Sequence, residues 1–326
     1  MKRRNVLWMA TIGVGLAAPT AWAGPFIIDV GTDFSGNDRT TTEPIRTLGF
    51  SNIYATSFYL GDPNAIGTTI VDTNILSEMN GLGYSAGTYP ALDGTSQVTL
   101  RDPNMVADRS ISRLQYEDSD TSGINAGNRH SGENWAFPDN EGWGLTFDYR
   151  IEGRIVEGSD GNPEPYFDSG YFDIFYQDGP AEQRTQVLRM VLEDSVLQAA
   201  NLDLLGTLTY EDFDSDSALV QEFFLDTETG RSFYDLITEG EVTSISWRLD
   251  TNVDPPLPLD SNLADLSAEN GGDMVFARQT ELSGSVRYQV NQVPEPTTIG
   301  LLGLGLMWLA WVMGKGRRSK MNLCAR

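Results

Sequence analysis

The sequence predicts an all-β fold, an antiparallel β-sandwich or a jelly-roll-like single domain, flanked by an N-terminal signal helix and a C-terminal transmembrane helix. Segments in which apolar and polar residues alternate dominate residues 24–292, as expected of strands with one buried and one solvated face. Turns rich in Gly, Asp, Asn and Pro separate these segments. Helical patterns are few, and a domain of this length can bury a single core.

Three segments show the alternation most clearly, 144–156, 241–250 and 284–292. The polar positions between their apolar residues include Arg248 and Arg287, which we expect on the solvated face. The residues that we expect to face the core are Leu145, Phe147, Tyr149, Ile151, Ile155, Ile245, Trp247, Leu249, Val286, Tyr288 and Val290.

Shorter segments complete the predicted domain. Residues 190–201 can also be read as a short helix, and 231–238 as another. The polar stretch 118–142 contains several glycines, and we predict a long loop there. The further strands are predicted at 53–60, 68–76, 96–101, 110–117, 170–177, 184–197, 202–210 and 274–281.

Residues 1–23 have the organisation of a secretory signal peptide. Basic residues at positions 2–4 precede an apolar stretch, and Ala21 and Ala23 form the A-x-A pattern of a cleavage site. We predict cleavage after Ala23, because the apolar run is short for a membrane span. An uncleaved signal anchor is the alternative.

The other end of the chain combines three features in a fixed order. A Pro-Glu-Pro tripeptide precedes the uncharged apolar stretch 297–314, and a basic cluster follows it. The apolar stretch is just long enough to span a bilayer as a helix, and the basic residues favour a cytoplasmic end. The residues that define this pattern are Pro294, Glu295, Pro296, Arg317 and Arg318.

This order of features resembles the PEP-CTERM sorting signal of Gram-negative bacteria that make exopolysaccharide. The resemblance implies that a membrane-embedded exosortase recognises the tripeptide and the span, and that the tail is removed after transient membrane insertion. It assigns residues 293–320 to the sorting signal and 321–326 to a short tail, with 24–292 as the exported domain. An ordinary single-pass membrane anchor is the alternative.

The charge of the chain excludes several classes of function. It carries 22 basic and 46 acidic residues, a net charge of −24. Residues 24–296 hold 14 arginines, no lysine and all 46 acidic residues, so their net charge is −32. This acidity excludes a nucleic-acid partner, which needs a basic face, and favours divalent cations as counter-ions. One Cys and one His exclude a disulfide framework and multi-Cys or His-cluster metal sites.

No set of residues in the sequence predicts catalysis. His130 lies in the polar loop, and no Gly-x-Ser-x-Gly elbow accompanies it. Glu133 and Glu141 are the best pair for glycosidase chemistry, but a chain with this many carboxylates supplies such pairs by chance. We therefore predict that the protein is not an enzyme.

Two weaker patterns point to binding. Asp212, Asp214 and Asp216 have a spacing that suits calcium, the one cofactor considered, although no EF-hand loop is completed. A plain acidic turn is the alternative. Trp135 and Trp143 are candidates for stacking on sugar rings, and carbohydrate binding is therefore a second possible function.

A second resemblance bears on the role of the whole chain. Residues 25–29, 247–256 and 276–285 are similar to the flocculation-associated PEP-CTERM proteins. The resemblance implies an exported cell-surface or matrix protein that supports cell aggregation in flocs or biofilms, with an exopolysaccharide or another cell-surface polymer as its partner. A secreted carbohydrate-binding module and, with less support, a secreted hydrolase are the alternatives.

Overall fold

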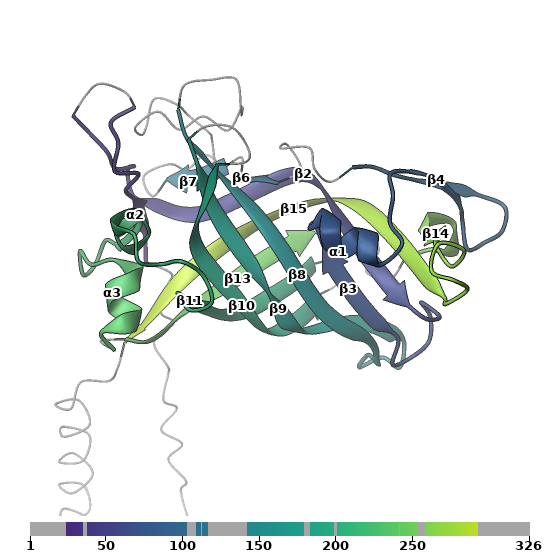
Figure 1. Cartoon of the computed structure of the whole chain (residues 1–326). Helices are drawn as coiled ribbons and strands as arrows, with labels where there is room; N and C mark the ends of the chain where they lie inside the picture. The colour runs from purple at the N-terminus through teal and green to yellow at the C-terminus, as the bar shows by residue number, and fades with distance from the viewer. Residues whose placement is uncertain are drawn as a thin grey trace, which may run out of the picture.

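The computed structural model describes residues 24–34, 38–102, 109–111, 113–116, 142–178, 183–198, 201–240, 242–252 and 258–292. Strands account for most of its elements (Figure 1). Within the described residues, no helix is both long and apolar enough to cross a membrane. The predicted signal and transmembrane helices lie outside these residues.

The elements follow one another as β1 (Phe26–Ile28), β2 (Ile45–Leu60), β3 (Thr69–Thr73), α1 (Leu76–Gly81), β4 (Gly87–Pro90), β5 (Gln97–Leu100), β6 (Ser110–Ile111), β7 (Arg113–Tyr116), β8 (Gly144–Glu157), β9 (Pro163–Gln177), β10 (Arg184–Gln198), β11 (Asn201–Thr209), α2 (Ala218–Glu222), β12 (Phe224–Asp226), α3 (Phe233–Thr238), β13 (Val242–Asn252), a 3-10 turn (Asp260–Asn262), β14 (Ala264–Asp265) and β15 (Val275–Gln292).

One antiparallel sheet forms the body of the molecule and closes on itself. Its long strands pair in the order β2, β3, β8, β9, β10, β11, β13 and β15, and β15 also pairs with β2. The predicted class, all-β and antiparallel, is confirmed. The finer arrangement differs from two facing sheets: strands of up to 18 residues let one twisted sheet bend round and enclose the core by itself.

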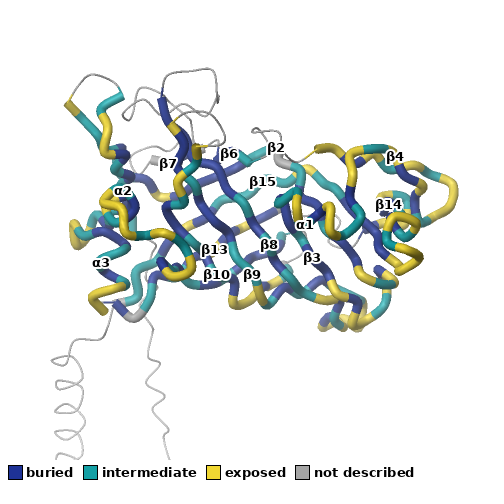
Figure 2. The backbone as a smooth tube through the Cα atoms, in the orientation of Figure 1, coloured by how far each residue is buried: buried dark blue, intermediate teal, exposed yellow. Residues whose placement is uncertain are grey.

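The inside of this closed sheet holds the main core (Figure 2). The alternation predicted for 144–156 is confirmed, because Phe147, Tyr149 and Ile151 are each only 3% exposed. Trp247 and Tyr288, from the other two alternating segments, are also buried. The alternating segments of β8, β13 and β15 therefore direct every second side chain into the core, as the period of two of a strand requires.

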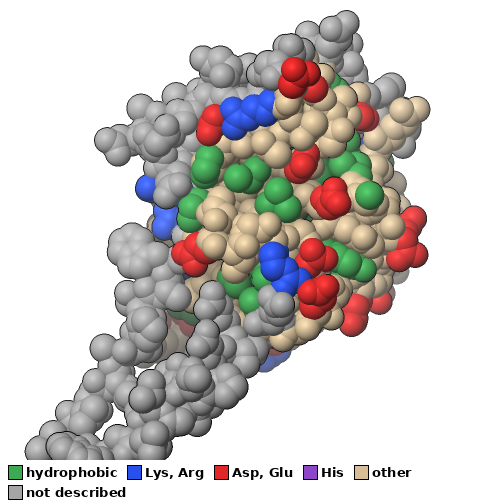
Figure 3. All heavy atoms as spheres, turned by 90° about the vertical axis from the view of Figure 1, so that its left-hand side faces the viewer, with side chains coloured by type: hydrophobic (Ala, Val, Ile, Leu, Met, Phe, Trp, Pro, Cys, Tyr) green, Lys and Arg blue, Asp and Glu red, His purple; other side chains and the backbone are tan. Residues whose placement is uncertain are grey.

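An aromatic cluster fills one end of the closed sheet. The rings of Phe26, Phe224, Phe233 and Tyr288 have centroids 5.3–6.2 Å apart. These residues come from β1, β12, α3 and the C-terminal part of β15, so the first and last described strands meet at this end. Acidic and hydrophobic side chains are interspersed over its surface (Figure 3).

A smaller core lies outside the sheet, towards its other end. The outward side chains of Phe58, Val71 and Ala277 on β2, β3 and β15 are covered by Met79 of α1 and Tyr84. The two-stranded sheet of β4 and β5 and the short β14 complete the cover. These strand segments are consequently buried on both faces, which explains why their sequences do not alternate cleanly.

Two predictions of secondary structure need correction, and one predicted helix is confirmed. Residues 190–201 are not a helix: β10 runs to Gln198. The helix predicted at 231–238 is confirmed as α3, whose first turn is capped by the Ser232 hydroxyl. The strands predicted at 274–281 and 284–292 are one strand, β15, which passes a bulge opposite β2 without ending.

Candidate functional site

Most of the sequence-predicted site residues lie outside the described residues. They are Ala21, Ala23, Trp135, Pro294, Glu295, Pro296, Arg317 and Arg318, together with His130, Glu133 and Glu141.

The three aspartates predicted to bind calcium lie in an exposed turn after β11. Asp212 has a positive φ of 67°, and the Asp214 carboxylate accepts a 3.4 Å hydrogen bond from the Asp216 backbone N–H. In the described part of the chain, no three Asp, Glu, His or Cys residues are placed to hold a metal ion together. The aspartates therefore form an acidic turn here, and the predicted calcium site is not supported.

Trp143 does not fit the predicted sugar-stacking role. Its side chain has no exposed area, and its ring lies 6.2 Å from that of Tyr176 in the main core. A sugar ring needs an open aromatic face, which Trp143 does not offer. In the sequence Trp143 follows a polar stretch, but in the structure it directly precedes β8 and is buried like the inward side chains of that strand.

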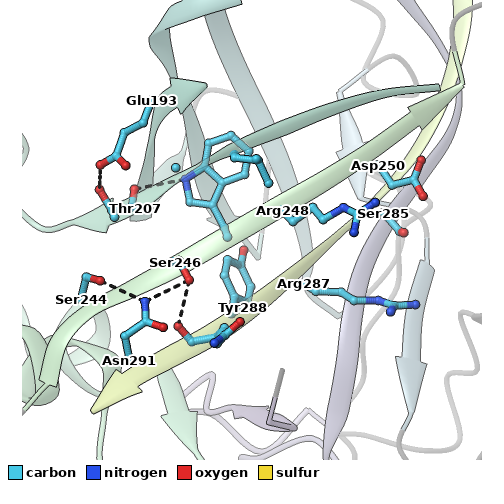
Figure 4. A pocket seen from close by; sticks show the side chains of 14 residues that line it. Glu193, Thr207, Ser244, Ser246, Arg248, Asp250, Ser285, Arg287, Tyr288 and Asn291 are labelled. Atoms are coloured by element: carbon cyan, nitrogen blue, oxygen red, sulfur yellow. Dashed lines mark hydrogen bonds between the residues drawn. The ribbon is translucent and has the colours of Figure 1, made fainter. Parts of the chain in front are cut away.

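A groove of about 630 Å³ crosses the outer face of β10, β11, β13 and β15 (Figure 4). β10 and β11 follow each other directly in the chain, β13 and β15 come from later segments, and the four strands are adjacent in the closed sheet. The residues that line it are Glu193, Leu205, Gly206, Thr207, Ser244, Ser246, Trp247, Arg248, Asp250, Ser285, Arg287, Tyr288, Gln289 and Asn291.

On the inner face of the sheet, the indole of Trp247 holds together the strands that form the floor of this groove. Its Nε1 donates hydrogen bonds of 3.1 Å to the backbone oxygens of both Val191 and Thr207. Gly206 makes this reach possible, because a Cβ there would lie 1.8 Å from the Val191 oxygen and 2.9 Å from Nε1. The groove floor is thus fixed across three neighbouring strands.

Hydroxyl and amide groups occupy one end of the groove. The Asn291 Nδ2 donates hydrogen bonds of 3.0 Å to Ser244 Oγ and 3.1 Å to Ser246 Oγ. Alongside, the Thr207 hydroxyl donates a 2.7 Å hydrogen bond to the Glu193 carboxylate. Such groups both donate and accept, so this end suits a ligand that carries hydroxyl groups.

Two arginines occupy the other end. Arg248 and Arg287 are direct partners on β13 and β15. Arg248 donates a 2.7 Å hydrogen bond to the buried carboxylate of Asp203, while its own side chain is 56% exposed. Arg287 is exposed and makes no ion pair or hydrogen bond within the described residues. Asp250 and Ser285 lie beside this pair (Figure 4).

A second polar cluster lies inside the closed sheet. The Asp72 carboxylate accepts hydrogen bonds of 2.6 Å from Ser57 Oγ and 2.5 Å from the Tyr149 hydroxyl. Burial raises the pKa of Asp72 above its usual range. The cavity beside this cluster measures only about 50 Å³ and is lined mainly by apolar side chains, too little space for a drug-sized ligand. The outer groove is therefore the better candidate site.

Sequence reasoning did not identify this groove. The alternation of 241–250 and 284–292 does predict that Arg248 and Arg287 face solvent, and the structure confirms it. Only the register between β13 and β15 places the two arginines opposite each other. No local sequence signal specifies that register.

Comparison with known proteins identifies one feature. The family model described as PEP-CTERM protein-sorting motif matches residues 292–318. No curated protein and no solved structure matches the chain. The matched segment begins at the last residue of β15.

Proposed function

We propose that this chain, which carries a PEP-CTERM sorting motif, is a non-enzymatic exported protein of the cell surface or exopolysaccharide matrix that supports cell aggregation in flocs or biofilms. The observation that carries the proposal is the motif at residues 292–318. The motif indicates an exported, surface-targeted chain that an exosortase processes. The polymer partner and the role in aggregation are our proposal.

The physical properties of the exported region support this role. A net charge of −32 over residues 24–296 keeps such a protein soluble and attracts divalent cations. The closed sheet gives its long strands a neighbour on each side, so the domain can be rigid without a disulfide. Adhesion would then link cells to polymer directly or through bridging cations.

The decisive experiment is the intact mass of the protein recovered from the extracellular-polymer fraction. We expect a mass that lacks residues 1–23 and the tail after the Pro-Glu-Pro tripeptide. A variant with Glu295→Ala serves as the control and should keep the tail. A wild-type protein that retains the C-terminal stretch and is found only in membranes would contradict the proposal.

The contribution of cations is tested separately. Chelation with EDTA should disperse aggregates and release the protein from them, if cations bridge its carboxylates to the polymer. Unchanged aggregation and unchanged retention of the protein would remove the cation step and leave direct adhesion.

Carbohydrate binding as a secreted module is a second candidate function. The observation that favours it is the polar groove of about 630 Å³ on β10, β11, β13 and β15. Binding of glycans to the full chain, lost when the groove is altered but not when other surfaces are, would support it.

A further inference from the structure

We infer that the groove on β10, β11, β13 and β15 binds a carboxylated, hydroxyl-rich polysaccharide, with Arg287 and Arg248 pairing with its carboxylates. This inference rests on the proposed surface or matrix function and names the chemistry of the partner. It places the contact on one face of the closed sheet (Figure 4).

Arg287 is exposed in the groove and has no carboxylate partner among the described residues. Most of the arginines that the structure describes are held by carboxylates, as Arg184 is by Asp148 and Arg189 by Asp173. Arg287 has no such partner within the described residues, in a domain where acidic residues greatly outnumber arginines. Its guanidinium therefore has its full set of donors available to an anion from outside.

Arg287 lies directly opposite Arg248 on the neighbouring strand. Like charges directly opposite each other on neighbouring strands are destabilising. Asp203 compensates Arg248 only, through the Nη2–Oδ2 contact of 2.7 Å. A carboxylate seated between the two guanidinium groups would relieve the remaining repulsion and make charge-assisted hydrogen bonds.

The polar side chains that line the groove form an extended row along β13 and β15. On β13 and β15 the outward pairs follow in register as Asp250 with Ser285, Arg248 with Arg287, Ser246 with Gln289 and Ser244 with Asn291. This row is about 20 Å long, at roughly 3.4 Å per residue along an antiparallel strand. A row of that length fits an extended chain better than a single small molecule.

The carboxylates in the groove narrow the choice of ligand. Glu193 and Asp250 accept hydrogen bonds readily, so they suit a chain whose hydroxyl groups donate. A polyphosphate has no such donors and would be repelled by both. A neutral glycan would leave Arg287 without a counter-charge. A polysaccharide that carries both carboxylates and hydroxyl groups can pair with the arginines at one end of the groove and form hydrogen bonds with the polar side chains at the other.

The acidity of the whole domain does not prevent this contact. Charges farther apart than about 8 Å are largely screened at physiological ionic strength. The arginine pair acts within hydrogen-bond distance of the ligand, where screening is weakest. Added salt should nevertheless weaken binding, because part of the interaction is between exposed charges.

The test compares two probes on the full chain: alginate, a polyuronate, and alginate whose carboxyl groups have been reduced to alcohols. The buffer contains EDTA, so cation bridges are absent. We expect the wild type to bind alginate at least tenfold more tightly than the reduced polymer. Arg287→Gln should weaken alginate binding tenfold or more, as loss of a charge-assisted hydrogen bond predicts, and should leave binding of the reduced polymer unchanged.

Arg46→Gln is the matched control. Arg46 is an exposed arginine on β2, outside the groove, so this variant makes the same change in net charge. We expect it to bind alginate like the wild type. Arg248 is not substituted in this test, because its replacement would leave the buried Asp203 carboxylate without its ion-pair partner and would destabilise the fold. Thermal unfolding of Arg46→Gln should match that of the wild type, because the Arg46 side chain makes no hydrogen bond or ion pair within the described residues. Arg287→Gln should be at least as stable as the wild type, because the substitution removes the repulsion with Arg248.

Three results would overturn the inference. They are an absence of alginate binding, equal affinity for the two polymers, and equal losses in the two arginine variants. The proposed function is judged separately, from the mass and location of the exported protein. If Arg287→Gln binds normally while the processed chain is still found in the polymer fraction, only the inference about the groove fails.

Discussion

The substitution Gly206→Ala tests how the groove floor is built. The new Cβ would lie 1.8 Å from the Val191 oxygen, and contacts below 3.0 Å are essentially never found, so the strands must separate by about 1.2 Å there. The same Cβ would lie 2.9 Å from Trp247 Nε1 and displace the indole from its two hydrogen bonds. Overpacking of this kind costs about 1–3 kcal/mol, and each lost hydrogen bond about 1 kcal/mol.

We therefore expect Gly206→Ala to lower the free energy of unfolding by about 3–5 kcal/mol, a large part of the stability of a typical domain. The assay is urea unfolding followed by circular dichroism. Gly81→Ala is the control, because a Cβ there meets nothing within 4 Å. The control should be neutral or stabilising by up to about 1 kcal/mol. A loss of less than about 0.5 kcal/mol in Gly206→Ala would refute this account of the floor.

Three further predictions concern the scaffold. Asp173→Ala should destabilise the fold by about 3 kcal/mol in urea unfolding, because it removes a buried carboxylate held by both Arg189 and Gln186; an equal loss in Arg189→Ala and in the double variant would confirm one shared interaction. Phe224→Ala should cost about 3–5 kcal/mol, since its ring is fully buried in the terminal aromatic cluster; a smaller loss would mean that the cluster repacks. Asp72→Asn should change the pH dependence of stability. Burial raises the pKa of Asp72 in the folded state, so its favourable contribution is complete below the unfolded pKa of about 3.9 and is lost as the pH rises through the folded pKa. The free energy of unfolding of the wild type, relative to that of Asp72→Asn, should therefore fall as the pH rises from the unfolded pKa through the folded pKa. If this difference in free energy stays constant from pH 3 to 8, the prediction is contradicted.

The sequence predicted which side chains of the clearest strands face inward, but not which strands are neighbours. Alternation at Phe147, Tyr149 and Ile151 reports burial on one face, and the structure confirms it. Closure depends on the pairing of Val275–Val286 with Leu48–Leu60, which are more than two hundred residues apart in the chain. No local pattern encodes that pairing, because it is stabilised only once the whole core has formed.

The candidate site shows the same limit. Residue type alone favoured Trp143 and the aspartates at 212, 214 and 216, yet Trp143 is buried and the aspartates do not gather around a metal position. The groove is lined instead by serines, an asparagine and arginines, residue types that do not by themselves indicate a site. They lie together only because of the register between β13 and β15. The short α1 and α2 were also missed, because one helical turn leaves little periodicity to detect.

The first and last described strands meet at one end of the closed sheet, and this determines which end of the domain lies next to the sorting motif. Phe26 lies against Tyr288, with ring centroids 5.3 Å apart, and the sorting motif starts at residue 292, where β15 stops. The folded domain and the motif are therefore joined without a spacer. The end of the domain with α2 and α3 is therefore the one next to the start of the motif, and the end with β4 and β14 lies on the opposite side of the closed sheet (Figure 1). The groove, on the flank between these ends, would then be open to polymer before the tail is removed as well as after.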